Sequence, residues 1–251
     1  MLSNITDLYK NNFIKAVLSS NKELYTYIHT NLNSNDLSYS NTIGYGGDNS
    51  LNIDLYAEEL FIKYLKTFGN IYSEECGFID AQSDYNIIID PIDGSDNFMS
   101  NLPYYGTSIA LKYKDDIIAG FVYNLATDIM IYKAFESDVL SIKLCSSSKI
   151  DLNIKRVSKI GIFERAYAYP KICQKLYTNK IKFRSPGAVA LSLSNAKNYD
   201  FVLFCADIRE FDIAASLYIC SDLFIYKTHK NLLISKNKQK FELIKEIIKE
   251  E

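Results

Sequence analysis

The pattern of apolar residues changes once along this chain, near residue 140. Before that point strand-like runs follow one another, several of them separated by Asp-containing turns, at 85–90, 104–113, 116–124 and 129–134. Such a series is typical of an antiparallel sheet. After it, expected strands (160–168, 181–184, 200–205, 231–235) alternate with expected helices (171–178, 186–198, 210–222, 238–250). We therefore expect an α+β subdomain over 1–139 and an α/β subdomain over 140–251 that share one site.

Two helices and a short strand are expected ahead of the first sheet. Residues 7–30 have a weak helical pattern. From Tyr56 to Phe68 apolar residues recur at helical spacing, and Gly69 stands where a helix would end. The short strand covers 70–72. The first half is thus expected to combine helices with its sheet.

The charge balance excludes several classes of partner. With 28 Lys and Arg against 30 Asp and Glu, the net charge of -2 gives no general attraction for nucleic acid or an anionic membrane. No apolar run approaches the roughly 18 residues that span a bilayer, and the first residues do not resemble a signal peptide. We therefore expect a cytoplasmic, unprocessed protein that needs neither nucleic acid nor a membrane.

The cysteines and histidines limit the kinds of metal site. Five cysteines are scattered without a Cys-x-x-Cys pair, and the two histidines lie far apart in sequence. This argues against a disulfide framework, a thiolate zinc site and an imidazole-based metal centre. Any bound metal would need oxygen ligands, which favours Mg²⁺, Mn²⁺ or Ca²⁺.

The most informative stretch begins where the strand at 85–90 ends. Asp90 ends that strand, Pro91 fixes a turn, and Asp93 supplies a second carboxylate. Gly94 and Ser95 follow and are placed to open a helix, whose free backbone N–H groups can receive phosphate oxygens. Two carboxylates beside such amides could hold a divalent cation and a phosphate together. The alternative is an ordinary Asp-rich turn.

Two other segments carry acidic residues of the same kind. Glu74 and Glu75 follow the short strand at 70–72. Asp212 falls in the first turn of the helix expected at 210–222, where a carboxylate also interacts favourably with the helix dipole. Taken singly, each of these signals is weak: solvated surface positions would best explain Glu74 and Glu75, and the helix dipole alone would account for Asp212.

Together these segments resemble the inositol monophosphatase family. That family belongs to the lithium-sensitive, Mg²⁺-dependent phosphatases, with fructose-1,6-bisphosphatase and 3'-phosphoadenosine-5'-phosphate phosphatase. Residues 71–75 (IYSEE) look like its first acidic motif, 90–95 (DPIDGS) like its signature and 211–215 (FDIAA) like its helical motif. Further similarity at 102–110, 120–124 and 184–188 extends the resemblance from about residue 50 to the C-terminus.

The resemblance implies a layered αβαβα sugar-phosphatase fold and a homodimer. It implies a phosphoric monoester hydrolase that acts on a small phosphorylated polyol or sugar by in-line attack of a metal-bound water. Two or three Mg²⁺ ions, with Mn²⁺ as a possible substitute, are implied as cofactors. The implied ligands are Glu74, Asp90, the carbonyl of Ile92, Asp93 and Asp212.

The resemblance also implies catalytic roles around one hydroxyl group. Ser95 stands where the family usually has Thr, and with Glu74 it would orient the attacking water. Asp54 looks like the family's helical aspartate that supports this hydroxyl. The alternative for Asp54 is a solvated helix face shared with Glu58, four residues later. Asp93, Gly94 and Ser95 would also contact the substrate.

A second substrate segment is implied near residue 187. Ser185 as N-cap and Pro186 as first helical residue are expected to begin the next helix. The backbone amides of Gly187, Ala188 and Val189 correspond to the part of the family site that meets sugar hydroxyls. A purely structural role for these amides is the alternative, because every helix start needs hydrogen-bond acceptors.

Some positions depart from the family pattern. Cys205 falls where inositol monophosphatases have a sugar-binding glutamate, and a thiol cannot accept hydroxyl hydrogen bonds as a carboxylate does. Inositol is therefore doubtful as the substrate, and Asp207 is the candidate replacement in the same loop. A fructose-1,6-bisphosphatase or a 3'(2'),5'-bisphosphate nucleotidase is one alternative. A non-catalytic metal-binding or interaction protein with the same fold is another.

Overall fold

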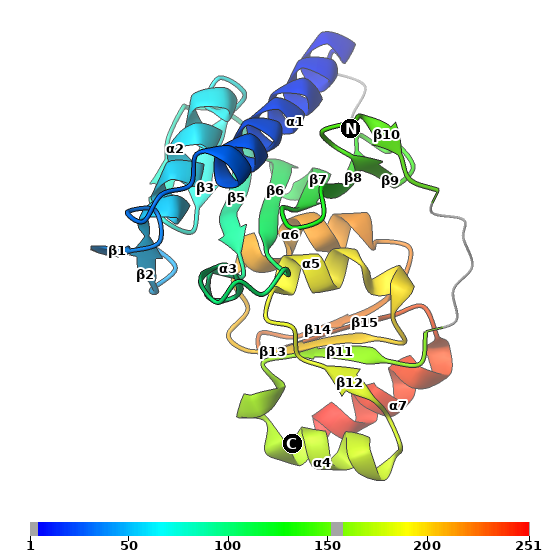
Figure 1. The fold of residues 1–251 in the computed structure, drawn as a ribbon. Helices are drawn as coiled ribbons and strands as arrows, with labels where there is room; N and C mark the ends of the chain where they lie inside the picture. Colours follow the sequence, from blue (N-terminus) through cyan, green and yellow to red (C-terminus); the bar gives the residue numbers. More distant parts are fainter. Residues whose placement is uncertain (1–4, 152–157, 251) are drawn as a thin grey trace.

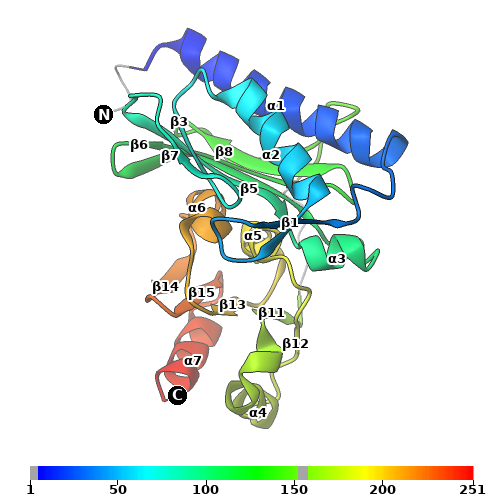
Figure 2. The ribbon, with the colours of Figure 1, turned by 90° about the vertical axis from the view of Figure 1, so that its left-hand side faces the viewer.

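Helices α1 (Asp7–Thr30) and α2 (Asn52–Leu65) form one outer layer of the computed structural model, which describes residues 5–151 and 158–250. Thr6 caps α1 by accepting a hydrogen bond from the amide of Tyr9. Both helices bury one apolar face against the first sheet and leave their polar faces in water. The helix pair therefore covers the far side of that sheet, as Figure 2 shows.

The first sheet has eight strands in the order β10-β9-β8-β7-β6-β5-β3-β4. They are β3 (Asn70–Ser73), β4 (Gly77–Ile79), β5 (Tyr85–Asp93), β6 (Gly106–Tyr113), β7 (Asp116–Asn124), β8 (Ile129–Ala134), β9 (Leu140–Lys143) and β10 (Ser148–Lys149). The predicted antiparallel series is confirmed from β5 to β8. β3 and β5 pair in parallel, with Ser73 opposite Ile89, so the residues that follow them reach the same edge.

The second sheet has five strands in the order β12-β11-β13-β15-β14. They are β11 (Gly161–Glu164), β12 (Phe183–Arg184), β13 (Val202–Cys205), β14 (Phe224–Lys227) and β15 (Asn231–Ser235). Between the sheets lie α5 (Val189–Ser194) and α6 (Glu210–Ile219), and α4 (Pro170–Thr178) and α7 (Lys238–Lys249) cover the other face (Figure 1). The predicted αβαβα layering is confirmed.

The remaining elements are short. Strands β1 (Tyr39–Ile43) and β2 (Asn49–Leu51) form a hairpin, and α3 (Ser95–Met99) follows β5. Within residues 5–151 and 158–250, two 3₁₀ turns cover Ala166–Ala168 and Ala196–Asn198. Within the described residues, no helix is long and apolar enough to cross a membrane.

Close packing of α6 on the first sheet fixes the position of its first turn. Gly120 in β7 lies under this helix, and a Cβ there would come 2.4 Å from the carbonyl oxygen of Ala215. A side chain at this position would push the helix away, because protein interiors leave no room for such an approach. Glycine at 120 therefore lets α6 approach the sheet that carries β5.

Some expected boundaries are wrong, for identifiable reasons. The helix expected at 186–198 begins at Val189, because Gly187 has a left-handed φ of 89° that a helix cannot contain. Ser185 does not cap it; its hydroxyl accepts a hydrogen bond from the Ala166 amide. The strand expected at 160–168 stops at Glu164, and the next residue has φ 58°.

The division at 139/140 stays a prediction. The strands β9 and β10, which follow residue 139, pair with the first sheet, so that sheet continues past the expected boundary. The second sheet begins with β11 at Gly161. The sequence did not predict six short strands, because none of them has a run of buried apolar residues: β1, β2, β4, β9, β10 and β14.

Candidate active site

Three carboxylates from separate segments converge between the layers. Glu74 follows β3, Asp90 lies in β5 and Asp212 lies in the first turn of α6. One carboxylate oxygen of each lies within 4.8 Å of the others. The parallel pairing of β3 with β5 explains the first two, and the close packing of α6 on the first sheet explains the third. The structure thus brings together three of the predicted metal ligands.

The cluster suits a divalent cation. Asp90 is buried, and its Oδ1 atom has no hydrogen-bond partner among the described residues. An unpaired buried carboxylate oxygen is costly, and a hard cation is a partner that would satisfy it. Burial raises the pKa of Asp90 well above its ordinary value, and the charge of Glu74 raises it further. The residues present therefore fit Mg²⁺ or Mn²⁺.

Burial also disfavours the charged forms of Glu74 and Asp212, and Arg209 partly offsets this effect. Burial raises the pKa of Glu74 to about 7, while Arg209 lowers it and Asp212 raises it. Burial also raises the pKa of Asp212, against hydrogen bonds and charge from Arg209. Without a cation, these acids therefore hold protons more tightly than they would in water.

The other two predicted ligands have partners within the protein. The Oδ2 atom of Asp93 accepts a hydrogen bond from the Leu191 amide at 2.9 Å, and the Val189 amide also bonds this carboxylate. The carbonyl oxygen of Ile92 lies 3.0 Å from the hydroxyl oxygen of Ser95. Asp93 thereby anchors the start of α5. That Asp93 and the carbonyl of Ile92 also bind metal stays a prediction.

The predicted hydroxyl–carboxylate pair is present. The hydroxyl oxygen of Ser95, in the first turn of α3, lies 3.1 Å from Oδ1 of Asp54 in α2. The other carboxylate oxygen of Asp54 accepts a hydrogen bond from the Leu51 amide. Burial raises the pKa of Asp54 to about 7. The alternative of a solvated face is wrong, because Asp54 and Glu58 are 4% and 6% exposed.

The amides predicted to meet the substrate donate to carboxylates of the protein. Gly187 donates to Oε2 of Glu164 at 2.9 Å, and the Ala188 amide bonds the same side chain. Ser192 donates to the other oxygen of Glu164. No motif pointed to Glu164, although a lone carboxylate ending an apolar strand is an informative signal. Substrate contact by Gly187, Ala188 and Val189 stays a prediction.

The position where the family has a sugar-binding glutamate faces away from this site. Cys205 is fully buried in the apolar cluster between the second sheet and helices α4 and α7. Asp207, two residues later, is exposed. Its predicted contact with substrate stays a prediction.

One basic residue stands among the acids and was not predicted. Atom Nη1 of Arg209 lies 2.8 Å from Oε1 of Glu74. Its Nε and Nη2 atoms each lie 3.0 Å from one oxygen of Asp212, which makes a two-pronged ion pair. In the sequence, the one indication that Arg209 belongs to the site was its position one helical turn before Asp212.

The hairpin of β1 and β2 lies against the same cluster. The amide of Gly46 donates to the backbone oxygen of Glu74 at 2.7 Å, and the amide of Tyr45 donates to that of Glu75. A Cβ on Gly46 would come 2.7 Å from the Cγ atom of Glu74. Ser50 bonds the side chain of Glu75, which belongs to the hairpin contact rather than to the cluster.

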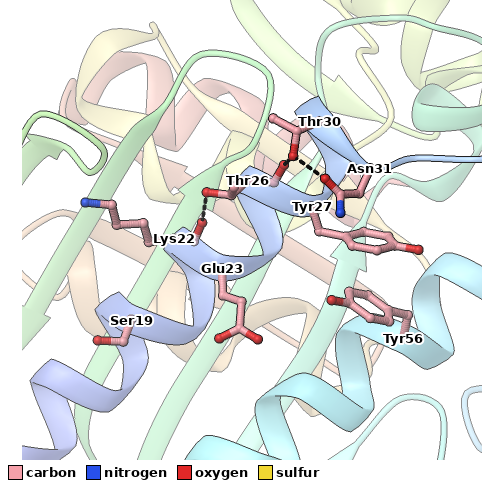
Figure 3. Close-up of a pocket in the computed structure, with 8 residues that line it drawn as sticks. All are labelled: Ser19, Lys22, Glu23, Thr26, Tyr27, Thr30, Asn31 and Tyr56. Atoms are coloured by element: carbon pink, nitrogen blue, oxygen red, sulfur yellow. Dashed lines mark hydrogen bonds between the residues drawn. The ribbon is translucent and has the colours of Figure 1, made fainter.

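A hollow of about 460 Å³ lies elsewhere, on helices α1 and α2 (Figure 3). The hydroxyls of Thr26 and Thr30 in its wall donate to carbonyls of their own helix, and Tyr27 stacks on Tyr56. It contains none of the carboxylates of the cluster. The candidate site is therefore the carboxylate cluster and not this hollow.

Comparison with known proteins agrees with the geometry. A fructose-1,6-bisphosphatase/inositol-1-monophosphatase of Methanocaldococcus jannaschii is 29% identical over 215 residues, 84% of this chain and 83% of that protein. A fructose-1,6-bisphosphatase of Pyrococcus furiosus is 39% identical over 83 residues, 33% of each chain. A solved inositol monophosphatase of Thermotoga maritima has a TM-score of 0.74 at 20% identity, over 94% of this chain and 98% of that one.

The family model described as "Inositol monophosphatase family" matches residues 23–223, which include all three carboxylates of the cluster. That family consists of metal-dependent phosphatases that act on small phosphorylated substrates. The chain therefore belongs to the inositol monophosphatase family and is a phosphoric monoester hydrolase.

Proposed function

We propose that this protein hydrolyses a small phosphorylated sugar or polyol with Mg²⁺ held by Glu74, Asp90 and Asp212. The observation that carries the proposal is the convergence of these carboxylates, one of which, Asp90, has a buried oxygen without a hydrogen-bond partner among the described residues. Asp93 and the Ile92 carbonyl complete the proposed ligand set, for two or three ions. When bound, Mg²⁺ neutralises the acids, polarises the phosphoryl oxygens and lowers the pKa of a water.

The side chains around the cluster would then orient the water that attacks phosphorus. A Ser95 hydroxyl that donates to Asp54 leaves its lone pairs to accept a hydrogen bond from that water. Glu74 would accept the second hydrogen bond of that water, or its proton. The backbone amides of Gly94 and Ser95 would receive phosphate oxygens at the start of α3.

The substrate we favour is a sugar phosphate rather than an inositol phosphate. Cys205 is buried on the far side of the second sheet, so it supplies no acceptor for inositol hydroxyls. Two of the relatives compared above carry the name fructose-1,6-bisphosphatase. Fructose-1,6-bisphosphate is therefore the first substrate to test, and a 3'(2'),5'-bisphosphate nucleotide is the second.

A phosphate-release assay tests the proposal. Purified protein would be given fructose-1,6-bisphosphate, inositol-1-phosphate and 3'-phosphoadenosine-5'-phosphate with Mg²⁺, with Mn²⁺ or with EDTA, and Li⁺ would be added as an inhibitor. We expect metal-dependent release that the D90N variant loses. No release from any ester by folded, metal-loaded protein would favour the non-catalytic alternative.

We also propose that the protein is a homodimer, as the family resemblance implies. The mass in solution, measured by light scattering after gel filtration, tests this directly. Twice the 28.7 kDa of the chain supports the dimer, and a mass of one chain contradicts it.

A further inference from the structure

Arg209 makes the same kinds of contact with the cluster that a bound cation would make. Its guanidinium contacts Glu74 with one nitrogen and both oxygens of Asp212 with two others. The side chains of Glu74 and Asp212 are 15% and 7% exposed, so these ion pairs are largely shielded from water. One positive charge of the chain therefore pairs with two of the three converging acids.

The same side chain also has partners outside the cluster. Nη1 of Arg209 lies 3.2 Å from the carbonyl oxygen of Gly46 and 3.2 Å from a carboxylate oxygen of Asp48, in the loop between β1 and β2. Its Cζ atom lies 4.9 Å from the ring centre of Phe211. The Asp48 side chain is 85% exposed, so its pair with Arg209 lies at the solvent edge. A guanidinium that leaves Glu74 would still have these partners.

A guanidinium and a divalent cation repel each other, and each is stabilised by contact with the same carboxylates. Each oxygen of Asp212 that accepts a hydrogen bond from Arg209 is a weaker ligand for a metal. The charge of Arg209 also acts on Asp90 and lowers its pKa, but the Oδ1 atom of Asp90 has no hydrogen-bond partner among the described residues.

We infer that Arg209 competes with the divalent cation for Glu74 and Asp212. It serves as a built-in counter-ion of the metal-free protein, and cation binding displaces it from Glu74 and Asp212 and leaves it with its contacts to Asp48 and Phe211. This inference rests on the proposed function, since it requires that the cluster binds a metal. Arg209 is accordingly a residue that sets metal affinity rather than a catalytic residue.

Calorimetric titration of metal-stripped protein with Mn²⁺ tests the inference without an activity measurement. The R209Q variant should bind Mn²⁺ about tenfold more tightly than the unmodified protein, because a competing like charge is gone. Its melting temperature in EDTA should be lower, because Glu74 and Asp212 lose their counter-ion. K112Q is the matched control: it removes one positive charge from a pair with Glu210, next to Arg209, and should leave Mn²⁺ affinity unchanged.

A second variant keeps the net charge and guards against poor folding of R209Q. In R209K the ammonium cannot fork both oxygens of Asp212, so it competes less, and Mn²⁺ affinity should lie between the other two proteins. Equal or weaker Mn²⁺ binding in both variants would overturn the inference and leave the proposed function standing. Absence of Mn²⁺ binding in the unmodified protein would overturn both.

Discussion

The hydroxyl oxygen of Ser95 lies 3.1 Å from a carboxylate oxygen of Asp54, although the two residues are 41 positions apart in sequence. The contact joins the first turn of α3 to the first turn of α2. It lies next to the end of β5, the strand that carries Asp90 and Asp93. The pair therefore links the helical layer to the carboxylate cluster.

Removal of the Ser95 hydroxyl should lower the turnover number more than the Michaelis constant. We expect S95A to lose about 10²- to 10³-fold in kcat, because a water-orienting hydroxyl acts mainly in the transition state. S95T retains the hydroxyl and should keep most of the activity. Steady-state kinetics at saturating Mg²⁺ measure both variants. Near-normal kcat in S95A would exclude the assigned role.

Metal-free protein should become less stable as the pH rises from about 5 to about 8. Burial raises the pKa of Asp54 and of Glu74 to about 7 in the folded state, whereas unfolded carboxyls titrate near 4. The folded state therefore binds more protons across this window, and stability is lost as the pH passes through the folded pKa values. Melting temperatures in EDTA measure the slope.

Mg²⁺ should restore much of the stability that the metal-free protein loses at higher pH, because a cation favours the ionised carboxylates. The increase in melting temperature on adding Mg²⁺ is thus expected to grow from pH 5 to pH 8. D54N lacks one titrating group and should show a shallower slope in EDTA. A slope of the opposite sign in the metal-free protein contradicts the assigned burial effects.

Substitution of Gly46 should disturb the cluster through the hairpin. The Cβ atom of G46A would come 2.8 Å from Oε1 of Glu74 and 3.0 Å from Nη1 of Arg209, so the loop or the glutamate must shift. We expect weaker Mn²⁺ binding and a lower kcat. G47A is the matched control, since a Cβ on Gly47 meets nothing within 4 Å. Its left-handed φ predicts about 1 kcal/mol of destabilisation instead. Unchanged Mn²⁺ binding in G46A would count against this role of the hairpin.

Replacement of Glu164 should loosen the start of α5. In E164Q the amide nitrogen cannot accept the hydrogen bonds that Gly187 and Ser192 donate, so one donor loses its partner. The expected cost is about 1–3 kcal/mol of unfolding free energy, measured by urea denaturation. If residues 187–189 also contact the substrate, the KM of E164Q should rise. Unchanged stability would show that Glu164 does not anchor the loop.

The sequence predicted the parts of the site that short motifs encode. Asp90 and Asp212 lie in motifs whose spacing is set by one strand end and one helix turn, and the structure brings both to Glu74. The antiparallel series was also predictable, because runs of buried β-branched residues such as 87–89 have a strong strand preference.

Arg209 and Glu164 were not predictable, because their importance comes from partners far away in the sequence. Arg209 meets Gly46 and Asp48 across more than 160 positions. Glu164 accepts a hydrogen bond from the backbone amide of a residue 23 positions later. The start of α5 was misplaced because the left-handed conformation of Gly187 overrides the capping preference of the Ser-Pro pair.

A crystal grown with Mn²⁺ tests the central claim most directly. Anomalous scattering from manganese locates the ion independently of any assay. We predict a peak bounded by Glu74, Asp90 and Asp212, with the Oδ1 atom of Asp90 among its ligands. Manganese bound elsewhere, or the three carboxylates pointing into separate regions of solvent, would contradict the account.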